Sequence, residues 1–116
     1  MRERIERCLT VATEAGRDPS TMLISTAFPG ALAEDAETAD QLIRRRAERF
    51  KVEPDEVKAT LDRYEIPHGT PEQAAARFAA MADAGITRIY LQLSANNLDE
   101  IALAVKAARR TAALVA

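Results

Sequence analysis

The chain has few of the residues that build metal centres and covalent cross-links. Its 116 residues include one cysteine, Cys8, and one histidine, His68. A single cysteine excludes a disulfide within the chain, which favours a cytoplasmic location. A structural zinc site would need carboxylates or a second subunit to complete its ligand set, so we expect no metal.

The chain also lacks an excess of either charge and any long apolar run. Lysine and arginine together number 16, against 18 aspartates and glutamates, so we expect no nucleic-acid partner. The longest uncharged runs are too short or too polar to span a bilayer, and the first residues lack the apolar core of a signal peptide. We therefore expect no membrane partner. A hydrophobic content of 47% is ordinary for a globular protein, and the length allows one domain at most.

The clearest local pattern is a helix that leads through a glycine into a buried strand. Thr70 is placed to cap the helix, with Pro71 at its first position and Gln73 at the capping-box position. Gly85 supplies the left-handed residue that ends a helix. Residues 86–93 then form a β-rich apolar run, too short for a buried helix. Half of a βαβ unit is the structure that this pattern favours.

Periodicity and turn residues predict four further helices and a second strand. The helices are expected at residues 4–15, 34–50 and 55–64 and from residue 98 onward, and the strand at residues 21–27, ended by Phe28-Pro29-Gly30. The order is then α-β-α-α-α-β-α, an α/β fold with two parallel strands and about five helices. The side chains expected to face inward include Ile5, Cys8, Leu9 and Ala12 in the first helix, Ile43, Ala47 and Phe50 in the second, and Leu98, Ile101, Val105 and Ala108 in the last.

Three consecutive arginines, Arg44, Arg45 and Arg46, lie within the helix at residues 34–50. Consecutive residues fan around most of a helix, so the three are not expected to converge on one anion. Acidic residues within three or four positions offer ion-pair partners, and we interpret the run as a solvated face. The candidate partners are Glu37, Asp40 and Glu48.

The two strands are apolar at nearly every position, which is typical of strands covered on both faces of a parallel sheet. Two such strands leave two edges whose backbone groups are unpaired. We therefore expect further strands to come from a longer chain or from another copy of this one.

Three sequence blocks together resemble a known family. They are residues 15–19 (AGRDP), residues 68–73 (HGTPEQ) and residues 84–93 (AGITRIYLQL). In order and approximate spacing they resemble the C-terminal third of the luciferase-like monooxygenases, which are flavin- or deazaflavin-dependent oxidoreductases built on a TIM barrel. The resemblance covers about residues 4–110.

The resemblance implies that residues 1–116 are a single partial-barrel segment whose two strands correspond to the seventh and eighth of the barrel. It implies FMN or a deazaflavin of the F-420 type as the coenzyme, a small-molecule substrate, and a reaction that transfers a hydride or activates oxygen. By the same resemblance, six N-terminal strands would be missing from this chain, and in the family those strands supply most of the catalytic side chains. The chain is therefore expected to be inactive alone.

Barrel active sites lie at the carboxyl ends of the strands, which directs attention to the residues after each strand. Asn96 and Asn97 follow the second strand as candidate cofactor contacts, although Asn97 also suits a helix cap with Glu100 at the capping-box position. His68 is the candidate catalytic residue, because it alone has an ordinary pKa near neutrality. A structural role for His68 stays open, since no positioned partner is evident.

Arg63 and Tyr64 are further candidate cofactor contacts, placed there only because they precede the block at residues 68–73. The sequence contains no glycine-rich phosphate loop, nucleophile elbow or metal-ligand spacing. Two alternatives to an oxidoreductase segment remain: a non-enzymatic half-barrel that self-associates as a homo-oligomer, and a small α/β binding module.

Overall fold

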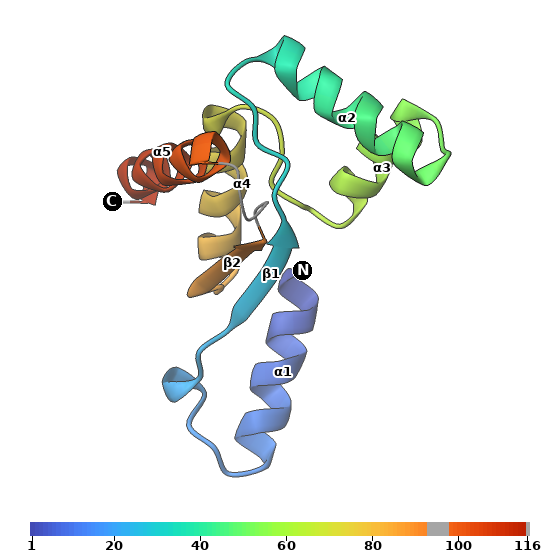
Figure 1. The fold of residues 1–116 in the computed structure, drawn as a ribbon. Coiled ribbons are helices and arrows are strands. Elements are labelled where there is room, and N and C mark those ends of the chain that lie inside the picture. The colour runs from blue at the N-terminus through green and yellow to red at the C-terminus, as the bar shows by residue number, and fades with distance from the viewer. Residues whose placement is uncertain (93–97, 116) are drawn as a thin grey trace.

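Two parallel strands lie among helices in the computed structural model, which describes residues 1–92 and 98–115. Apart from a short 3-10 turn, the described elements follow the predicted order α-β-α-α-α-β-α, so the α/β class with two parallel strands and five helices is confirmed (Figure 1). The elements are α1 (Arg2–Glu14), η1 (Pro19–Thr21), β1 (Ser25–Pro29), α2 (Ala36–Phe50), α3 (Pro54–Arg63), α4 (Pro71–Asp83), β2 (Arg88–Gln92) and α5 (Leu98–Val115).

β1 starts four residues later and ends two residues later than the strand predicted at residues 21–27, and Phe28 and Pro29 belong to it instead of ending it. The cause is local, because the Asp18 carboxylate accepts a hydrogen bond of 2.9 Å from the Ser20 N–H and starts η1. That turn includes Thr21, the first residue of the predicted strand. Pairing extends past the proline, since the Gly30 N–H donates to the Gln92 carbonyl at 2.8 Å. Donors alternate along a strand, so the Pro29 nitrogen, which carries no hydrogen, lies on the outer edge.

The ends of α4 match the prediction from the sequence. The Gln73 N–H donates to the Thr70 hydroxyl at 3.4 Å, and the Thr70 N–H donates to the Gln73 side-chain oxygen at 2.9 Å, which completes the capping box. Gly85 follows the helix with a φ of +101°, as a left-handed end requires. At α2, the Asp35 carboxylate accepts from the Thr38 N–H at 2.7 Å, and this bond lowers the pKa of Asp35 below its ordinary value.

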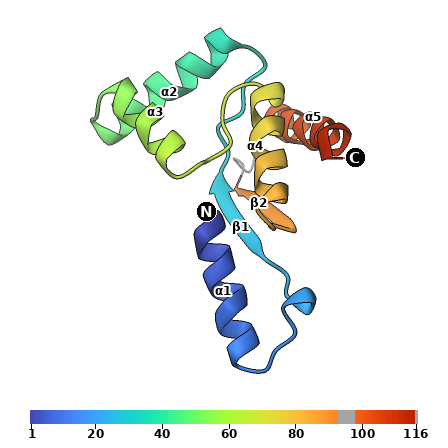
Figure 2. The same cartoon turned by 180° about the vertical axis from the view of Figure 1, so that it is seen from behind.

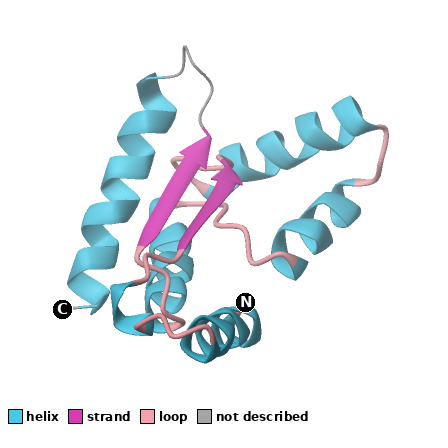
Figure 3. Ribbon diagram, turned by 90° about the horizontal axis from the view of Figure 1, so that it is seen from below, coloured by secondary structure: helices cyan, strands magenta, loops and turns pink. Residues whose placement is uncertain are grey.

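The main core lies between the sheet, α4, α5 and the start of α1. Helices α4 and α5 cover the same side of the two strands (Figure 3). A second, smaller cluster joins α2 to α3. The main cluster contains Ile5, Phe28, Leu32, Ala74, Phe78, Met81, Ile86 and Ala107, and the second contains Ile43, Ala47, Val57 and Leu61.

The other side of the sheet is exposed. Along β2 the burial alternates, with Ile89 and Leu91 half-buried toward the core and Arg88, Tyr90 and Gln92 exposed. β1 follows the same alternation at Ser25, Ala27 and Pro29, which are exposed. The interpretation of strands covered on both faces is therefore wrong for this chain by itself. We call the exposed side, formed by Ser25, Ala27, Pro29, Arg88, Tyr90 and Gln92, the open face.

The chain is extended for its length. Its Cα radius of gyration is 15.9 Å, whereas a compact domain of this size has a radius of about 13 Å. Helix α1 and the α2–α3 pair project from opposite ends of the sheet (Figures 1 and 2). Helix α1 and the α2–α3 pair are therefore joined through one small sheet and make few contacts with each other.

Several side chains predicted to face inward are exposed. Cys8 is exposed in α1, and Phe50 is 63% exposed at the end of α2. In α5 the predicted stripe faces outward: Leu98 is 78% exposed and Val105 is 46% exposed, while Ala107 is fully buried. The reason is that α5 is apolar on two sides, and its alanine-rich side, which permits close approach, packs on α4.

Candidate functional site

The loop after β1 and the start of α4 lie side by side at the carboxyl end of the sheet. The Gly69 N–H donates to the Ala31 carbonyl at 3.0 Å, and the Ala33 N–H donates to the Gly69 carbonyl at 2.9 Å. These bonds form a short parallel bridge between Leu32 and Gly69. The segment after the predicted strand, Phe28-Pro29-Gly30, is thus divided: Phe28 is in the core, and Pro29 and Gly30 reach the surface of a groove.

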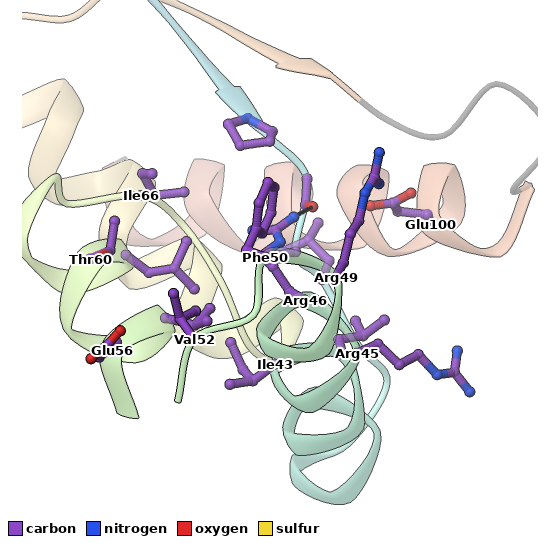
Figure 4. Close-up of a pocket in the computed structure, with 17 residues that line it drawn as sticks. Ile43, Arg45, Arg46, Arg49, Phe50, Val52, Glu56, Thr60, Ile66 and Glu100 are labelled. Carbon is purple, nitrogen blue, oxygen red and sulfur yellow. Dashed lines mark hydrogen bonds between the residues drawn. The ribbon is translucent and has the colours of Figure 1, made fainter. Parts of the chain in front are cut away.

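This groove, of about 870 Å³, is bounded by the end of β1, α2, α3 and the α3–α4 connection (Figure 4). We call it the α2–α3 groove. Its size falls within the range of about 300–1,000 Å³ that is usual for small-molecule sites. Most of its lining is apolar, and the charged side chains that reach it are Arg45, Arg46, Arg49, Glu56 and Glu100.

The arginines of α2 form the predicted solvated face only in part and without the ion pairs that the sequence suggested. Arg44 and Arg45 are exposed, as predicted. Arg46 is half-buried and donates to the Gly30 carbonyl at 3.2 Å, so it ties α2 to the end of β1. Within the described residues, no carboxylate lies within 4.0 Å of the guanidinium of Arg44, Arg45 or Arg49. Asp40, one of the partners expected for them, instead pairs with Lys58 at 3.2 Å.

Arg44 differs from its neighbours in position, because it lines a separate depression on the other side of α2. The expectation that the three consecutive arginines would not converge is therefore correct for Arg44. Arg45 and Arg46 share the α2–α3 groove with Arg49, which the sequence analysis did not single out. The signal that was available is the spacing of Arg46 and Arg49, three positions apart on one side of a helix.

His68, the candidate catalytic residue, lies outside the groove. Its Nε2 is 3.1 Å from Oδ1 of Asp62, and the same oxygen accepts from Arg77 at 2.7 Å. Because Asp62 belongs to α3 and Arg77 to α4, this cluster joins the two helices across their connection. The geometry favours the structural role of His68, and the partner that the sequence analysis could not identify is Asp62.

The remaining candidate contacts are dispersed. Arg63 is the last residue of α3, and its guanidinium carbon lies 5.9 Å from the centre of the Tyr64 ring. Tyr64 is 57% exposed, and neither residue lines the α2–α3 groove. Asn96 and Asn97 lie outside the residues that the structure describes.

Two features are absent from the described part of the chain. Residues 1–92 and 98–115 contain no group of three histidine, cysteine or acidic side chains arranged to hold a metal ion. No helix in these ranges combines the length and the apolar character that crossing a membrane requires. Comparison with protein-family models, with curated proteins and with solved structures finds no match for this chain.

Proposed function

We propose that this chain is the C-terminal segment of a luciferase-like (β/α)8 barrel, part of a flavin- or deazaflavin-dependent oxidoreductase that is inactive without its other strands. The observation that carries the proposal is the open face, set opposite two helices that cover the same sheet from outside. In a barrel of this type the helices surround the strands, and the other side of every strand faces the barrel interior.

The pairing of the strands supports the same proposal. β1 and β2 run parallel from the Ser25–Arg88 pair to the Pro29–Gln92 pair, and among the described residues no further strand pairs with either outer edge. An isolated sheet of two parallel strands has little stability of its own. Neighbouring strands on both edges would satisfy the exposed backbone groups, as they do in a closed barrel.

Helix α5 provides an independent argument. Leu98, Ile101 and Val105 are exposed by 78%, 43% and 46%, and their spacing places them along one side of the helix. Burying a large aliphatic side chain contributes about 1.5–3 kcal/mol, so an uncovered stripe of three indicates a missing neighbour. In a complete ring of helices, the last helix contacts the first helix as well as the one before it, and the stripe suits that contact.

The residues of this chain fit the margin of a coenzyme site, not its centre. FMN or an F-420-type deazaflavin would supply the ring that carries a hydride or activates oxygen in this family. The chain's own contribution is the end of β1 at Gly30 and the groove beside it, both at the carboxyl end of the sheet. His68 is held by Asp62 outside that groove, so we assign it no step in the reaction.

Fragment complementation tests the proposal. The chain is mixed with a fragment that contains the first six βα units of a luciferase-like enzyme, and sedimentation and coenzyme fluorescence are recorded. We expect a one-to-one complex that binds FMN or the deazaflavin more tightly than either piece alone. Ala27→Arg places a long charged side chain on the open face and should prevent the complex, because the barrel interior is closely packed.

Ala59→Arg, on an exposed position of α3 outside both the open face and the apolar stripe of α5, is the matched control and should leave the complex intact. Both alanines are exposed in the free chain, so the free energy of unfolding of each variant should lie within about 0.5 kcal/mol of that of the parent. Failure to form the complex, or an equal complex with Ala27→Arg, would overturn the proposal.

A second candidate function, self-association without catalysis, is favoured by the same unpaired edges and by Leu23, which is 69% exposed just before β1. Sedimentation of the free chain separates the two. A stable dimer that the six-unit fragment does not displace would support self-association over the barrel segment.

A further inference from the structure

The α2–α3 groove combines an apolar lining with a cationic wall on one side. The wall is formed by α2, which directs Arg46 and Arg49 into the groove. The apolar side chains come from the end of α2, the turn after it and the α3–α4 connection, and include Phe50, Val52 and Ile66. In Figure 4, Arg46 lies beside Phe50 near the centre of the groove, and Arg45 extends outward from the helix.

Arg46 is held in place without being neutralised. It is half-buried, and its bond of 3.2 Å to the Gly30 carbonyl uses one of the five N–H donors of the guanidinium. A carbonyl carries no formal charge, so the positive charge of Arg46 remains available to a ligand. Arg49 follows three positions later on the same side of α2, and its guanidinium carbon lies 5.9 Å from the centre of the Phe50 ring.

The negative side chains of the groove come from other elements. Glu56 belongs to α3 and Glu100 to α5, whereas Arg46 and Arg49 both belong to α2. None of the ion pairs among the described residues joins these arginines to a carboxylate. The groove is therefore lined by three arginines against two glutamates, and in Figure 4 Glu100 lies beside Arg49. This excess of positive charge suits a ligand that carries negative charge.

We propose that the α2–α3 groove binds a phosphate monoester that carries an apolar or aromatic group. The phosphate lies against Arg46 and Arg49, since guanidinium groups pair with phosphate oxygens in a fixed, two-pronged geometry. The apolar group lies against Phe50 and Ile66. Because FMN is itself an aromatic phosphate monoester, this inference deepens the proposed function and rests on it for the role of the groove. Its test uses phenyl phosphate and the free chain, so its failure is distinguishable from a failure of the barrel complex to form.

Titration of the full chain with phenyl phosphate tests this site, with calorimetry or amide NMR shifts as the readout. Arg49→Gln removes one charged hydrogen-bonding group and should weaken binding about tenfold or more. Arg44→Gln is the matched control, because it makes the same change in charge on the same helix but outside the groove. It should change the affinity less than about twofold in 0.15 M salt, where charges beyond about 8 Å are screened.

A second comparison tests the apolar part. Phenyl phosphate should bind about tenfold more tightly than inorganic phosphate, and Phe50→Ser should reduce that difference without weakening inorganic phosphate. Because Phe50 is 63% exposed, this variant is expected to fold. The proposal is overturned by no binding, by equal losses in Arg49→Gln and Arg44→Gln, or by benzoate binding as tightly as phenyl phosphate.

Discussion

Substitution of Gly69 by alanine should destabilise the chain through two separable effects. Gly69 is buried with a φ of +89°, and its N–H and carbonyl are bonded to Ala31 and Ala33, so its backbone cannot relax easily. An L-residue in such a conformation costs about 1–2 kcal/mol. In addition, the new methyl group would overlap the side-chain oxygen of Gln73, which accepts from the Thr70 N–H.

Displacing that oxygen costs the capping bond, worth about 1 kcal/mol. We therefore expect Gly69→Ala to lower the free energy of unfolding by roughly 2–3 kcal/mol. Gln73→Ala alone should lower it by about 1 kcal/mol, because it removes the same bond. The double variant should cost no more than Gly69→Ala alone, since the bond can be lost only once, and the two effects should fall short of additivity by about 1 kcal/mol.

Urea unfolding followed by far-UV circular dichroism measures the free energies of unfolding of the parent, the two single variants and the double variant. The comparison is valid if the dependence of the free energy on urea concentration has the same slope in all four. Gln41→Ala is the control, because Gln41 is exposed on α2 and should combine additively with Gly69→Ala. Strict additivity of Gly69→Ala with Gln73→Ala would refute the reasoning, because it would mean that the methyl group and the capping bond do not compete.

Three further changes should also follow from the structure. Phe78→Ala in the main core should cost about 3–5 kcal/mol in thermal unfolding, whereas Tyr64→Ala, at an exposed position, should change stability by less than about 0.5 kcal/mol. Ala107→Leu should cost about 1–3 kcal/mol, because its fully buried position between α4 and α5 leaves no room for a larger side chain, and an unchanged melting temperature would contradict this. The pKa of Asp35 is lowered in the folded chain, so its contribution to stability is present above the ordinary value of 3.8 and is lost as the pH falls through the lower folded value. In urea unfolding measured as a function of pH, the free energy of unfolding should accordingly decrease less with falling pH in Asp35→Asn than in the parent.

Features that depend on neighbouring residues could be predicted from the sequence. The capping box of Thr70 and Gln73 and the left-handed Gly85 need only residues within one helix and its ends. The order of the elements followed from the same local signals. The position of β1 did not, because Asp18 also suits a turn, and its bond to Ser20 starts a turn that includes Thr21, the first residue of the predicted strand.

Features that depend on distant residues could not be predicted. α5 is apolar on two sides, and only the packing of Ala107 on α4 decides which side is buried. The α2–α3 groove exists because α2 and α3 fold back on the end of β1, where Arg46 meets Gly30. The partners of His68 likewise lie on two different helices, so the sequence could identify the histidine but not its role.

Pro29 restricts how any other chain can add to the outer edge of β1. Only Ser25 and Ala27 present N–H donors there, since Pro29 has none and the alternate residues face β2. An incoming strand that slid toward the carboxyl end would leave a carbonyl without a donor. The proline therefore limits this edge to a narrow set of alignments, which disfavours indiscriminate aggregation while leaving room for one well-matched neighbour.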